Sequence, residues 1–287
     1  MSGPDPRERP AIQESEAASG HEIVQTRGGA MAMRSLAAGE VMHPGVGPVA
    51  EAEQLYVRQS HLAERLVAAG PARSLVVYDV GLGAGSNAFA AWAASARAPA
   101  GAATLTLVSF ERDLGALALA LEHAADFAIG PDALVAGRAL LASGAHESPR
   151  TSWRLLPGDL LAALRQPLPP ADIVFWDPFS PRANPQSWTV AAFRAAHRRA
   201  APRGTLFTYS ASTATRVALL LAGWSVGVGA SIGDKAATTA AAIDAADLAA
   251  PLGRDWLRRL ARPDVPLPPD APPDFVTAIA GLPQFAT

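Results

Sequence analysis

The stretch VVYDVGLGAGSN, residues 76–87, is the feature that most constrains this chain. A nearly continuous apolar run, SLVVYDV, contains an acid near its end, and Gly81, Gly83 and Gly85 follow at alternate positions. Such runs are typical of strands that are buried on both faces of a parallel sheet. Glycine lets the main chain bend and approach a ligand, because no Cβ blocks the way. The pattern predicts a strand followed by a ligand-binding turn, with a plain tight turn as the alternative.

Apolar runs and helical patterns alternate along the rest of the chain. Predicted strands cover 74–80, 103–111, 152–159, 171–179, 204–210, 224–230 and 236–243, and helical patterns stand between them. This alternation is typical of an α/β fold with a parallel, doubly wound sheet. We therefore expect a mostly parallel seven-stranded sheet with helices on both faces and an antiparallel last strand.

The segments outside this alternation predict the remaining organisation. Residues 1–20 are polar and proline-bearing, which is typical of a disordered leader. A small N-terminal hairpin over 22–36 and a helix from Pro48 are expected to open the main domain, residues 21–250. An inserted helix and loop are expected over 129–150, and residues 251–287 form a proline-rich C-terminal tail.

Composition excludes several classes of protein. The 287 residues contain no cysteine, so the chain has neither disulfides nor a thiolate metal site, and no histidine–carboxylate spacing suggests another metal. The formal net charge of −2 gives no general attraction to nucleic acid or to anionic membranes. No apolar run is long and uninterrupted enough to span a bilayer. We expect a cytoplasmic protein without a metal; the sequence does not indicate an oligomeric state.

The spacing of the glycines discriminates among nucleotide-like ligands. A dinucleotide fingerprint, G-x-G-x-x-G, would require glycine where Ser86 stands, and the G-K-[ST] of a phosphate-binding loop is absent. The observed D-x-G-x-G-x-G is the pattern of class I methyltransferases, which bind S-adenosyl-L-methionine. This ligand carries an ammonium, a sulfonium, a ribose diol and an adenine, and carboxylates at successive strand ends could meet these groups.

The predicted cofactor-binding residues follow from this order of strand ends. Asp79 supplies negative charge near the ammonium or sulfonium, Glu111 accepts from the ribose hydroxyls, and Asp159 accepts from the adenine amino group. Gly158 allows close approach, and Asn87 completes the set with the three glycines. Taken singly, Glu111 is also consistent with a solvated strand end and Asp159 with a helix N-cap.

The stretch FWDPFSPRANPQSW, residues 175–188, predicts the substrate side. Asp177, Pro178 and Phe179 resemble the D/N-P-P-[FYW] loop of methyltransferases that modify nitrogen. Asp177 can accept a hydrogen bond from the substrate N–H and aim the nitrogen lone pair, and Phe179 can stack on a base. A carboxylate also stabilises the protonated form of an alkyl amine, so either burial outweighs this effect or Asp177 takes the proton. The candidate substrate residues are Pro178, Phe179, Arg182, Asn184 and Trp188.

Several stretches together resemble the MnmC-like methyltransferase family. They are residues 39–66, DVGLGAGSN, residues 177–226 and GDKAATTAA near the C-terminus. The resemblance implies a class I methyltransferase, Rossmann-like fold that uses S-adenosyl-L-methionine. It also implies methylation of 5-aminomethyl-2-thiouridine at the tRNA wobble position, with Asp177 as the catalytic residue. Some members carry a flavin-dependent oxidase as well, for which 287 residues leave no room, so we expect the methyltransferase part alone.

Other functions remain open at this stage. The chain could be a class I methyltransferase of a small molecule or protein, or a catalytically silent S-adenosyl-L-methionine-binding module. Two groups of basic residues would suit phosphate binding to tRNA or simply form solvated helix faces. These groups are Arg194, His197, Arg198, Arg199 and Arg203, and Arg254, Arg258, Arg259 and Arg262. His43 and His61 could approach the mouth of the cofactor or substrate site, although a lone histidine is more often structural.

Overall fold

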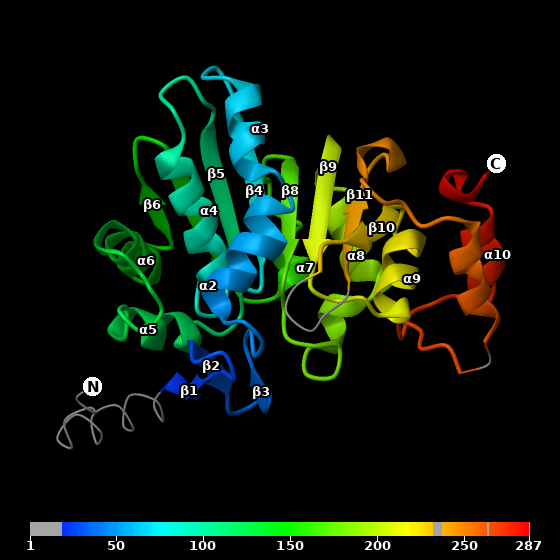
Figure 1. The fold of residues 1–287 in the computed structure, drawn as a ribbon, viewed down its shortest axis with the longest axis horizontal. Helices are drawn as coiled ribbons and strands as arrows, with labels where there is room; N and C mark the ends of the chain where they lie inside the picture. Colours follow the sequence, from blue (N-terminus) through cyan, green and yellow to red (C-terminus); the bar gives the residue numbers. More distant parts are fainter. Residues whose placement is uncertain (1–18, 232–236, 263, 287) are drawn as a thin grey trace.

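The computed structural model describes residues 19–231, 237–262 and 264–286 and contains two β-sheets (Figure 1). Most of the predicted leader and the lysine of GDKAATTAA lie outside these residues. The larger sheet has eight strands in the order β10-β11-β9-β8-β4-β5-β7-β6. Its strands are β4 (Ser74–Val80), β5 (Thr104–Glu111), β6 (Ala145–Glu147), β7 (Thr151–Pro157), β8 (Ala171–Trp176), β9 (Ala200–Thr208), β10 (Ser225–Gly229) and β11 (Thr238–Ala242).

Strand pairing confirms the predicted fold class. The five strands β7, β5, β4, β8 and β9 pair in parallel, and β11 inserts antiparallel between β9 and β10. This is the predicted seven-stranded sheet with an antiparallel last strand. The structure adds one short edge strand, β6, which pairs antiparallel with β7 and comes from the segment expected to be only helix and loop.

The N-terminal hairpin is part of a small separate sheet. Its strands β1 (His21–Gln25) and β2 (Met31–Ser35) pair antiparallel as predicted, and a third strand, β3 (Glu40–Val41), pairs with β2. Figure 1 shows this sheet below the large sheet, next to α5 (Gly115–Glu122). Its third strand leads the chain directly to the ends of the parallel strands.

Alternation along the strands divides the core into two layers. In β4, Leu75 and Val77 pack into one layer, and Val76, Tyr78 and Val80 pack into the other. The first layer is covered by α3 (Leu62–Ala69), α4 (Ser86–Arg97) and α6 (Pro131–Ser143). The second is covered by α7 (Leu160–Ala163), α8 (Val190–His197) and α9 (Thr213–Leu221). Burial of both sheet faces explains the continuous apolar runs in the sequence.

The helix expected from Pro48 is interrupted. It consists of α2 (Pro48–Glu51), a π-helical segment (Ala52–Arg58) and α3, which begins after His61. His61 has a left-handed backbone conformation, with φ of 53°. A π-helix has a wider turn than an α-helix and is often found at functional sites. Here it directs three consecutive side chains, Leu55, Tyr56 and Val57, into the protein.

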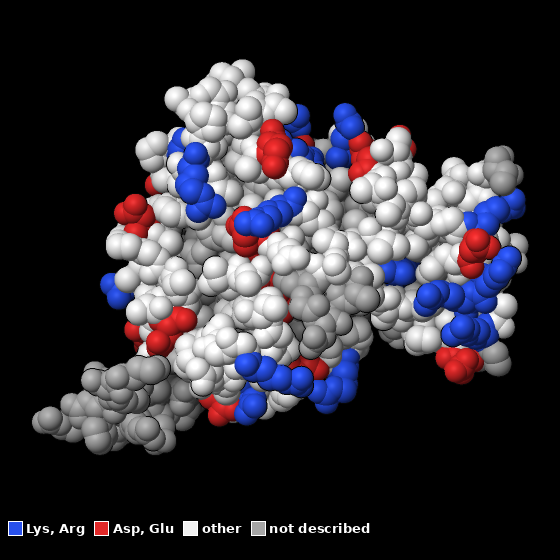
Figure 2. Space-filling model, in the orientation of Figure 1, with Lys and Arg blue, Asp and Glu red and all other residues white. Residues whose placement is uncertain are grey.

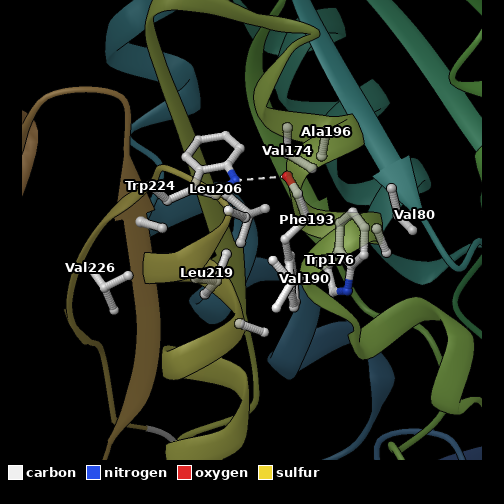
Figure 3. Close-up of a cluster of buried hydrophobic side chains, with 14 of the residues drawn as sticks. Val80, Val174, Trp176, Val190, Phe193, Ala196, Leu206, Leu219, Trp224 and Val226 are labelled. Carbon is white, nitrogen blue, oxygen red and sulfur yellow. Dashed lines mark hydrogen bonds between the residues drawn. The ribbon is translucent and has the colours of Figure 1, made fainter. Parts of the chain in front are cut away.

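Aromatic side chains fill the centre of the second layer (Figure 3). Trp224 donates from Nε1 to the backbone oxygen of Phe193 over 3.0 Å, which ties the start of β10 to α8. The rings of Phe193 and Trp176 lie 4.6 Å apart between their centroids. This packing fixes the end of β8, the strand that carries the predicted substrate loop.

The proline-rich tail packs against this same layer. It forms the 3₁₀ segment Arg254–Ala261, helix α10 (Phe275–Ala280) and the 3₁₀ turn Pro283–Phe285. Ile279 and Phe285 are fully buried within the core, and the Gln284 side chain binds both backbone groups of Val226 in β10. Two shorter 3₁₀ segments, Pro185–Trp188 and Ala245–Asp247, complete the described structure.

Phe285→Ala should destabilise the whole main domain, because Phe285 is 1% exposed and its removal leaves a cavity in the shared core. We expect a loss of about 3–5 kcal/mol in the free energy of unfolding, measured by urea titration. Val276→Ala, at a 42% exposed position in the same tail, serves as the control and should change stability by less than about 0.5 kcal/mol. A small effect of Phe285→Ala would mean that the tail is not part of the cooperative fold.

Candidate active site

A cavity of about 440 Å³ lies at the carboxyl ends of the parallel strands. Ligands of open α/β sheets bind in this position. Its walls come from the segment after β3, the glycine loop after β4, the end of β5, the loop after β8 and Tyr209 after β9. The lining residues are Glu40, Val41, Met42, His43, Pro44, Glu51, Gly81, Leu82, Gly83, Ala84, Glu111, Asp177, Pro178, Phe179, Ser180, Asn184 and Tyr209.

Gly81 brings the glycine loop against the substrate loop. Its φ is 86°, and a Cβ there would lie 2.7 Å from the backbone nitrogen and Cα of Pro178. The two loops are also joined by a hydrogen bond of 2.8 Å from the Asp177 N–H to the Val80 carbonyl. Only glycine combines this backbone conformation with this close approach.

The other two glycines serve different contacts. Gly83 has a φ of 52°, and a Cβ there would lie 3.0 Å from the sulfur of Met42, which extends over the loop from the N-terminal segment. Gly85 has a φ of 88° and packs against Phe89 of α4, which leaves no room for a side chain. Each of the three alternating glycines therefore has its own close contact: Gly81 with the substrate loop, Gly83 with Met42 and Gly85 with α4.

Glu111 shapes the glycine loop as well as lining the cavity. Its Oε2 accepts from the Gly83 N–H over 2.9 Å, and its Oε1 accepts from the N–H groups of Arg112 and Asp113. These hydrogen bonds fix the carboxylate at the end of β5, between the main cavity and a smaller one. The position agrees with that predicted for a ribose-binding acid.

The smaller cavity, about 60 Å³, adjoins the first and contains the predicted adenine-side residues. Gly158 and Asp159 line it together with residues that also line the larger cavity, among them Gly81 and Glu111. Asp159 Oδ1 accepts from the N–H of Ala162 over 2.8 Å, so this residue is the N-cap of α7. Gly158 has a φ of 105° with open space where a side chain would be.

Asp79 lies beneath the glycine loop and lines neither cavity. It is fully buried in β4, and its Oδ2 accepts from the Ser109 hydroxyl, whose oxygen accepts from Trp153 Nε1. Burial raises the pKa of Asp79 to about 7, and the nearby carboxylates of Asp177 and Glu111 add to this effect. Its Oδ1 is buried without a hydrogen-bond donor among the described residues. Asn87 Oδ1 is likewise buried without a donor among the described residues, and Asn87 also lines neither cavity.

Asp177 is the centre of the substrate side. Its Oδ2 accepts from Asn87 Nδ2 over 2.6 Å and lies 3.5 Å from His43 Nε2. Burial raises the pKa of Asp177, while His43, Tyr56 and Asn87 act in the opposite direction by stabilising its charge. Burial and the nearby Asp177 also raise the pKa of the Tyr56 hydroxyl well above its usual value. Thus Asn87, predicted as a cofactor residue, directly contacts the predicted catalytic carboxylate.

Two aromatic side chains support the loop that follows Asp177. Trp188 Nε1 donates to the Phe179 carbonyl over 2.8 Å, and the Tyr209 hydroxyl donates to the Pro178 carbonyl over 3.1 Å. Trp188 is 3% exposed and lines neither cavity, so it holds the loop from behind, although we expected it on the substrate side. Phe179 and Asn184 line the cavity as expected.

Glu40 connects the small sheet to the substrate loop. It accepts from the N–H and the hydroxyl of Ser180, over 3.1 and 2.5 Å, and from Arg182 over 3.0 Å. Although burial acts against ionisation, these hydrogen bonds lower the pKa of Glu40. Arg182, predicted to contact substrate, is therefore engaged with Glu40 at the rim.

Several site residues were not predicted from the sequence, and five of them carry contacts described above. Glu40, Met42 and Glu51 come from the N-terminal segment, Tyr56 from the π-helical turn and Tyr209 from the end of β9. The acid in GEVMHPG and the YS pair after the fifth apolar run were the available signals, but neither forms a spacing that indicates chemistry. His43 was considered and lies in the cavity wall, whereas His61 lines a different groove.

That groove is larger, about 1130 Å³, and lies at the amino ends of the strands, where Leu75 and Asp172 line it. None of the predicted cofactor or substrate residues lines it. Its arginines contact neighbouring acids and carbonyls, as in the ion pairs of Arg73 with Asp172 and Arg203 with Asp247. We therefore place the candidate active site in the cavity of about 440 Å³ at the carboxyl ends of the strands and not in this groove.

Comparison with known proteins shows which families this chain is similar to. Residues 140–244, which include the substrate loop, match a family model described as S-adenosyl-L-methionine-dependent methyltransferase. The chain is 32% identical over 196 residues to the tRNA 5-methylaminomethyl-2-thiouridine biosynthesis bifunctional protein MnmC of Chromobacterium violaceum. That alignment covers 66% of this chain and 30% of the relative. The protein of the same name from Azoarcus sp. is 34% identical over 199 residues, which cover 67% and 31%.

The chain resembles the MnmC-like methyltransferases. The comparisons confirm the predicted resemblance and the class of S-adenosyl-L-methionine-dependent methyltransferase. The crystal structure of MNMC2 from Aquifex aeolicus superposes with a TM-score of 0.67 at 23% identity, covering 97% of this chain and 92% of that one, and confirms the fold. The chain spans about 30% of the length of the bifunctional relatives it matches.

Two further observations concern membranes and metals. Among residues 19–231, 237–262 and 264–286, no helix has both the length and the hydrophobicity to cross a membrane. Within the same ranges, no group of three or more histidines and acids is arranged to hold a metal ion.

Gly81→Ala should weaken binding of S-adenosylhomocysteine at least tenfold, about 1.4 kcal/mol, because the new methyl group would displace the Pro178 backbone. Isothermal calorimetry measures this directly. Gly101→Ala, where a Cβ meets no atom within 4 Å, is the matched control and should bind normally. Equal affinity of both variants would show that the loop contact does not shape the ligand site.

Asp79→Asn should stabilise the ligand-free protein more at pH 8 than at pH 5. Because the pKa of Asp79 is raised to about 7, the folded state binds more protons than the unfolded state between about pH 4 and 7. The free energy of unfolding therefore falls as pH rises through this window, and the amide removes that loss. We expect a relative gain of about 2–4 kcal/mol in urea titrations. Asp132→Asn, at an exposed position in α6, should show no such pH dependence.

Proposed function

We propose that this chain transfers a methyl group from S-adenosyl-L-methionine to the aminomethyl nitrogen of a wobble uridine in tRNA. The reaction converts 5-aminomethyl-2-thiouridine to 5-methylaminomethyl-2-thiouridine. The observation that carries the proposal is the carboxylate of Asp177, whose side chain is 9% exposed, in the wall of the cavity beside the glycine loop. The MnmC relatives are named for the biosynthesis of 5-methylaminomethyl-2-thiouridine in tRNA, which supports the choice of tRNA as substrate.

The residues present fit S-adenosyl-L-methionine. The glycine loop can provide a backbone cradle, and we assign Glu111 to the ribose and Gly158 and Asp159 to the adenine, since these residues line the two adjoining cavities. Asp79 and Asn87, which were predicted to bind the cofactor, line neither cavity and are not part of this cradle. When bound, this cofactor supplies an electrophilic methyl group on a positively charged sulfur.

The cavity is also suited to a cationic substrate. Four carboxylates line it, those of Glu40, Glu51, Glu111 and Asp177, and His43 is its single basic lining residue within the described chain. Carboxylates in a site of low exposure attract cations strongly, since little water screens them. A primary amine and a sulfonium both fit this charge distribution.

Asp177 performs the central task in this proposal. Its carboxylate accepts from the N–H of the amine and holds the nitrogen so that its lone pair points along the path of transfer. Asn87 fixes the carboxylate from one side, and Phe179 offers a ring for stacking on the uridine.

A basic surface in the C-terminal tail is suited to bind the phosphates of the rest of the tRNA. The three arginines of the segment Arg254–Ala261 and the adjacent Arg262 are exposed, and Figure 2 shows basic side chains gathered there. By contrast, Arg194 and Arg199 of the other predicted group donate to backbone carbonyls of the protein itself. We propose the C-terminal group as the phosphate contact.

Asp177→Asn should retain affinity for S-adenosylhomocysteine within about threefold while methyl transfer to tRNA falls by about 10²–10⁴. The amide preserves the shape of the carboxylate and can still accept from Asn87, but it loses the negative charge. Transfer is measured with tRNA from cells lacking this gene, by nucleoside mass spectrometry. Asp274→Asn, at an exposed position before α10, is the control.

Two results would contradict the proposal. If tRNA from such cells does not accumulate 5-aminomethyl-2-thiouridine, the substrate is a different one. If the wild-type protein binds the cofactor but transfers no methyl group to this tRNA, the chain is a methyltransferase of another substrate or a silent binding module.

A further inference from the structure

His43 lies between two carboxylates in the wall of the candidate active site. Its Nδ1 is 3.2 Å from Glu51 Oε2, and its Nε2 is 3.5 Å from Asp177 Oδ2. The His43 side chain is 13% exposed, and those of Glu51 and Asp177 are 6% and 9% exposed. His43 and Glu51 come from the N-terminal segment and Asp177 from the loop after β8, so the arrangement depends on tertiary structure.

The backbone at His43 is held in an uncommon conformation. Its φ is 52°, in the left-handed region that non-glycine residues seldom occupy. Such conformations cost free energy and are concentrated at functional sites. Here the conformation directs the imidazole from the N-terminal segment onto Asp177.

The contact with Glu51 determines which ring nitrogen is basic. A carboxylate that accepts from Nδ1–H fixes the tautomer in which Nε2 carries the lone pair. That nitrogen faces Asp177 Oδ2, another acceptor, so the two atoms attract each other only when one proton lies between them. His43 and Asp177 therefore form a pair that can share a proton.

We propose that His43 holds the proton that the substrate amine must lose, receiving it through Asp177, and that Glu51 positions the imidazole for this task. This inference rests on the proposed function. It answers the question of how a carboxylate can bind an amine without keeping it protonated: the carboxylate passes the proton on.

The proton balance of the step is complete. An alkyl amine with an ordinary pKa near 10 arrives as an ammonium ion and has no lone pair. Its positive charge beside Asp177 displaces the shared proton to solvent, so the imidazole is neutral. One N–H proton then passes to Asp177 and on to His43 Nε2, which frees the electron pair on nitrogen.

The nitrogen pair forms the new N–CH₃ bond as the S–CH₃ bond breaks, and the electrons of that bond remain on sulfur. The product leaves as a secondary ammonium ion, and His43 returns its proton to solvent. Other titratable groups in electrostatic contact with this pair or lining the same cavity are Glu40, Tyr56, Asp79, Glu111 and Tyr209. None of these five side chains is an imidazole. His43 presents its Nε2 to Asp177 Oδ2 at 3.5 Å, so we assign the role of proton acceptor to His43.

The test compares the wild type with His43→Asn on tRNA that carries the primary amine, between pH 6.5 and 9.5. Asparagine tolerates the left-handed backbone, so the fold should persist. We expect kcat to fall about 10²-fold at pH 7, and the deficit to shrink below about tenfold at pH 9.5, where about a quarter of an amine with a pKa near 10 arrives neutral. Affinities for S-adenosylhomocysteine and for tRNA, measured directly, should change by less than about threefold.

Glu51→Gln provides a second variant with the same direction of effect. It should lower kcat less than His43→Asn does, with the same recovery at high pH, because the imidazole remains but is less well positioned. His61→Asn is the matched control: His61 has nearly the same backbone conformation, with φ of 53°, but lines the other groove. Its kcat should equal that of the wild type at every pH.

The outcomes separate this inference from the proposed function. A wild type that methylates the tRNA, together with a His43→Asn deficit that is constant with pH or absent, would overturn the role of His43 alone. A wild type that is inactive on this tRNA would overturn both. A deficit that shrinks with pH in His43→Asn and Glu51→Gln, but not in His61→Asn, supports the inference.

Discussion

The site depends on the contact between two backbones at Gly81. The loop after β4 and the loop after β8 approach so closely there that a single methyl group would separate them. A hydrogen bond from the Asp177 N–H to the Val80 carbonyl fixes the approach. Because the first loop shapes the cofactor side and the second carries Asp177, this contact sets the distance between the two reactants. Positioning of this kind supplies much of the acceleration in a direct transfer.

Charge within the cavity is balanced around this contact. Buried carboxylates are costly unless a cation or a proton accompanies them. The raised pKa values of Asp79 and Asp177 express that cost in the ligand-free protein. Two cationic reactants would reduce it, so the free energy stored in these acids favours binding. His43 is the basic side chain among the described residues that line the cavity, and in our proposal its imidazole takes up and releases the proton.

The sequence predicted the scaffold well because parallel strands impose a strong pattern. Both sheet faces are buried, so the strand segments are apolar throughout, and their ends carry Glu111, Asp159 and Asp177 at one edge of the sheet. Roles that depend on side-chain direction were harder to predict. Trp188 belongs to the distinctive stretch 175–188, yet its ring packs in the core, where its Nε1–H donates to the Phe179 carbonyl. Residues such as Glu40 reach the site only through the small sheet, and no local pattern encodes that packing.

The π-helical segment has a consequence for how this region tolerates change. Its wide turn directs Leu55, Tyr56 and Val57 inward at consecutive positions, which a regular α-helix of 3.6 residues per turn could not do. Loss of one residue from this turn would restore the regular α-helical spiral, because the wider turn holds one extra residue, and the flanking helices would keep their register. Within the turn itself the side chains would change direction, so the Tyr56 hydroxyl would lose its place near the Asp177 carboxylate although tyrosine itself is unchanged. Over these seven residues the length of the chain is therefore as much a part of the active site as the identity of its side chains.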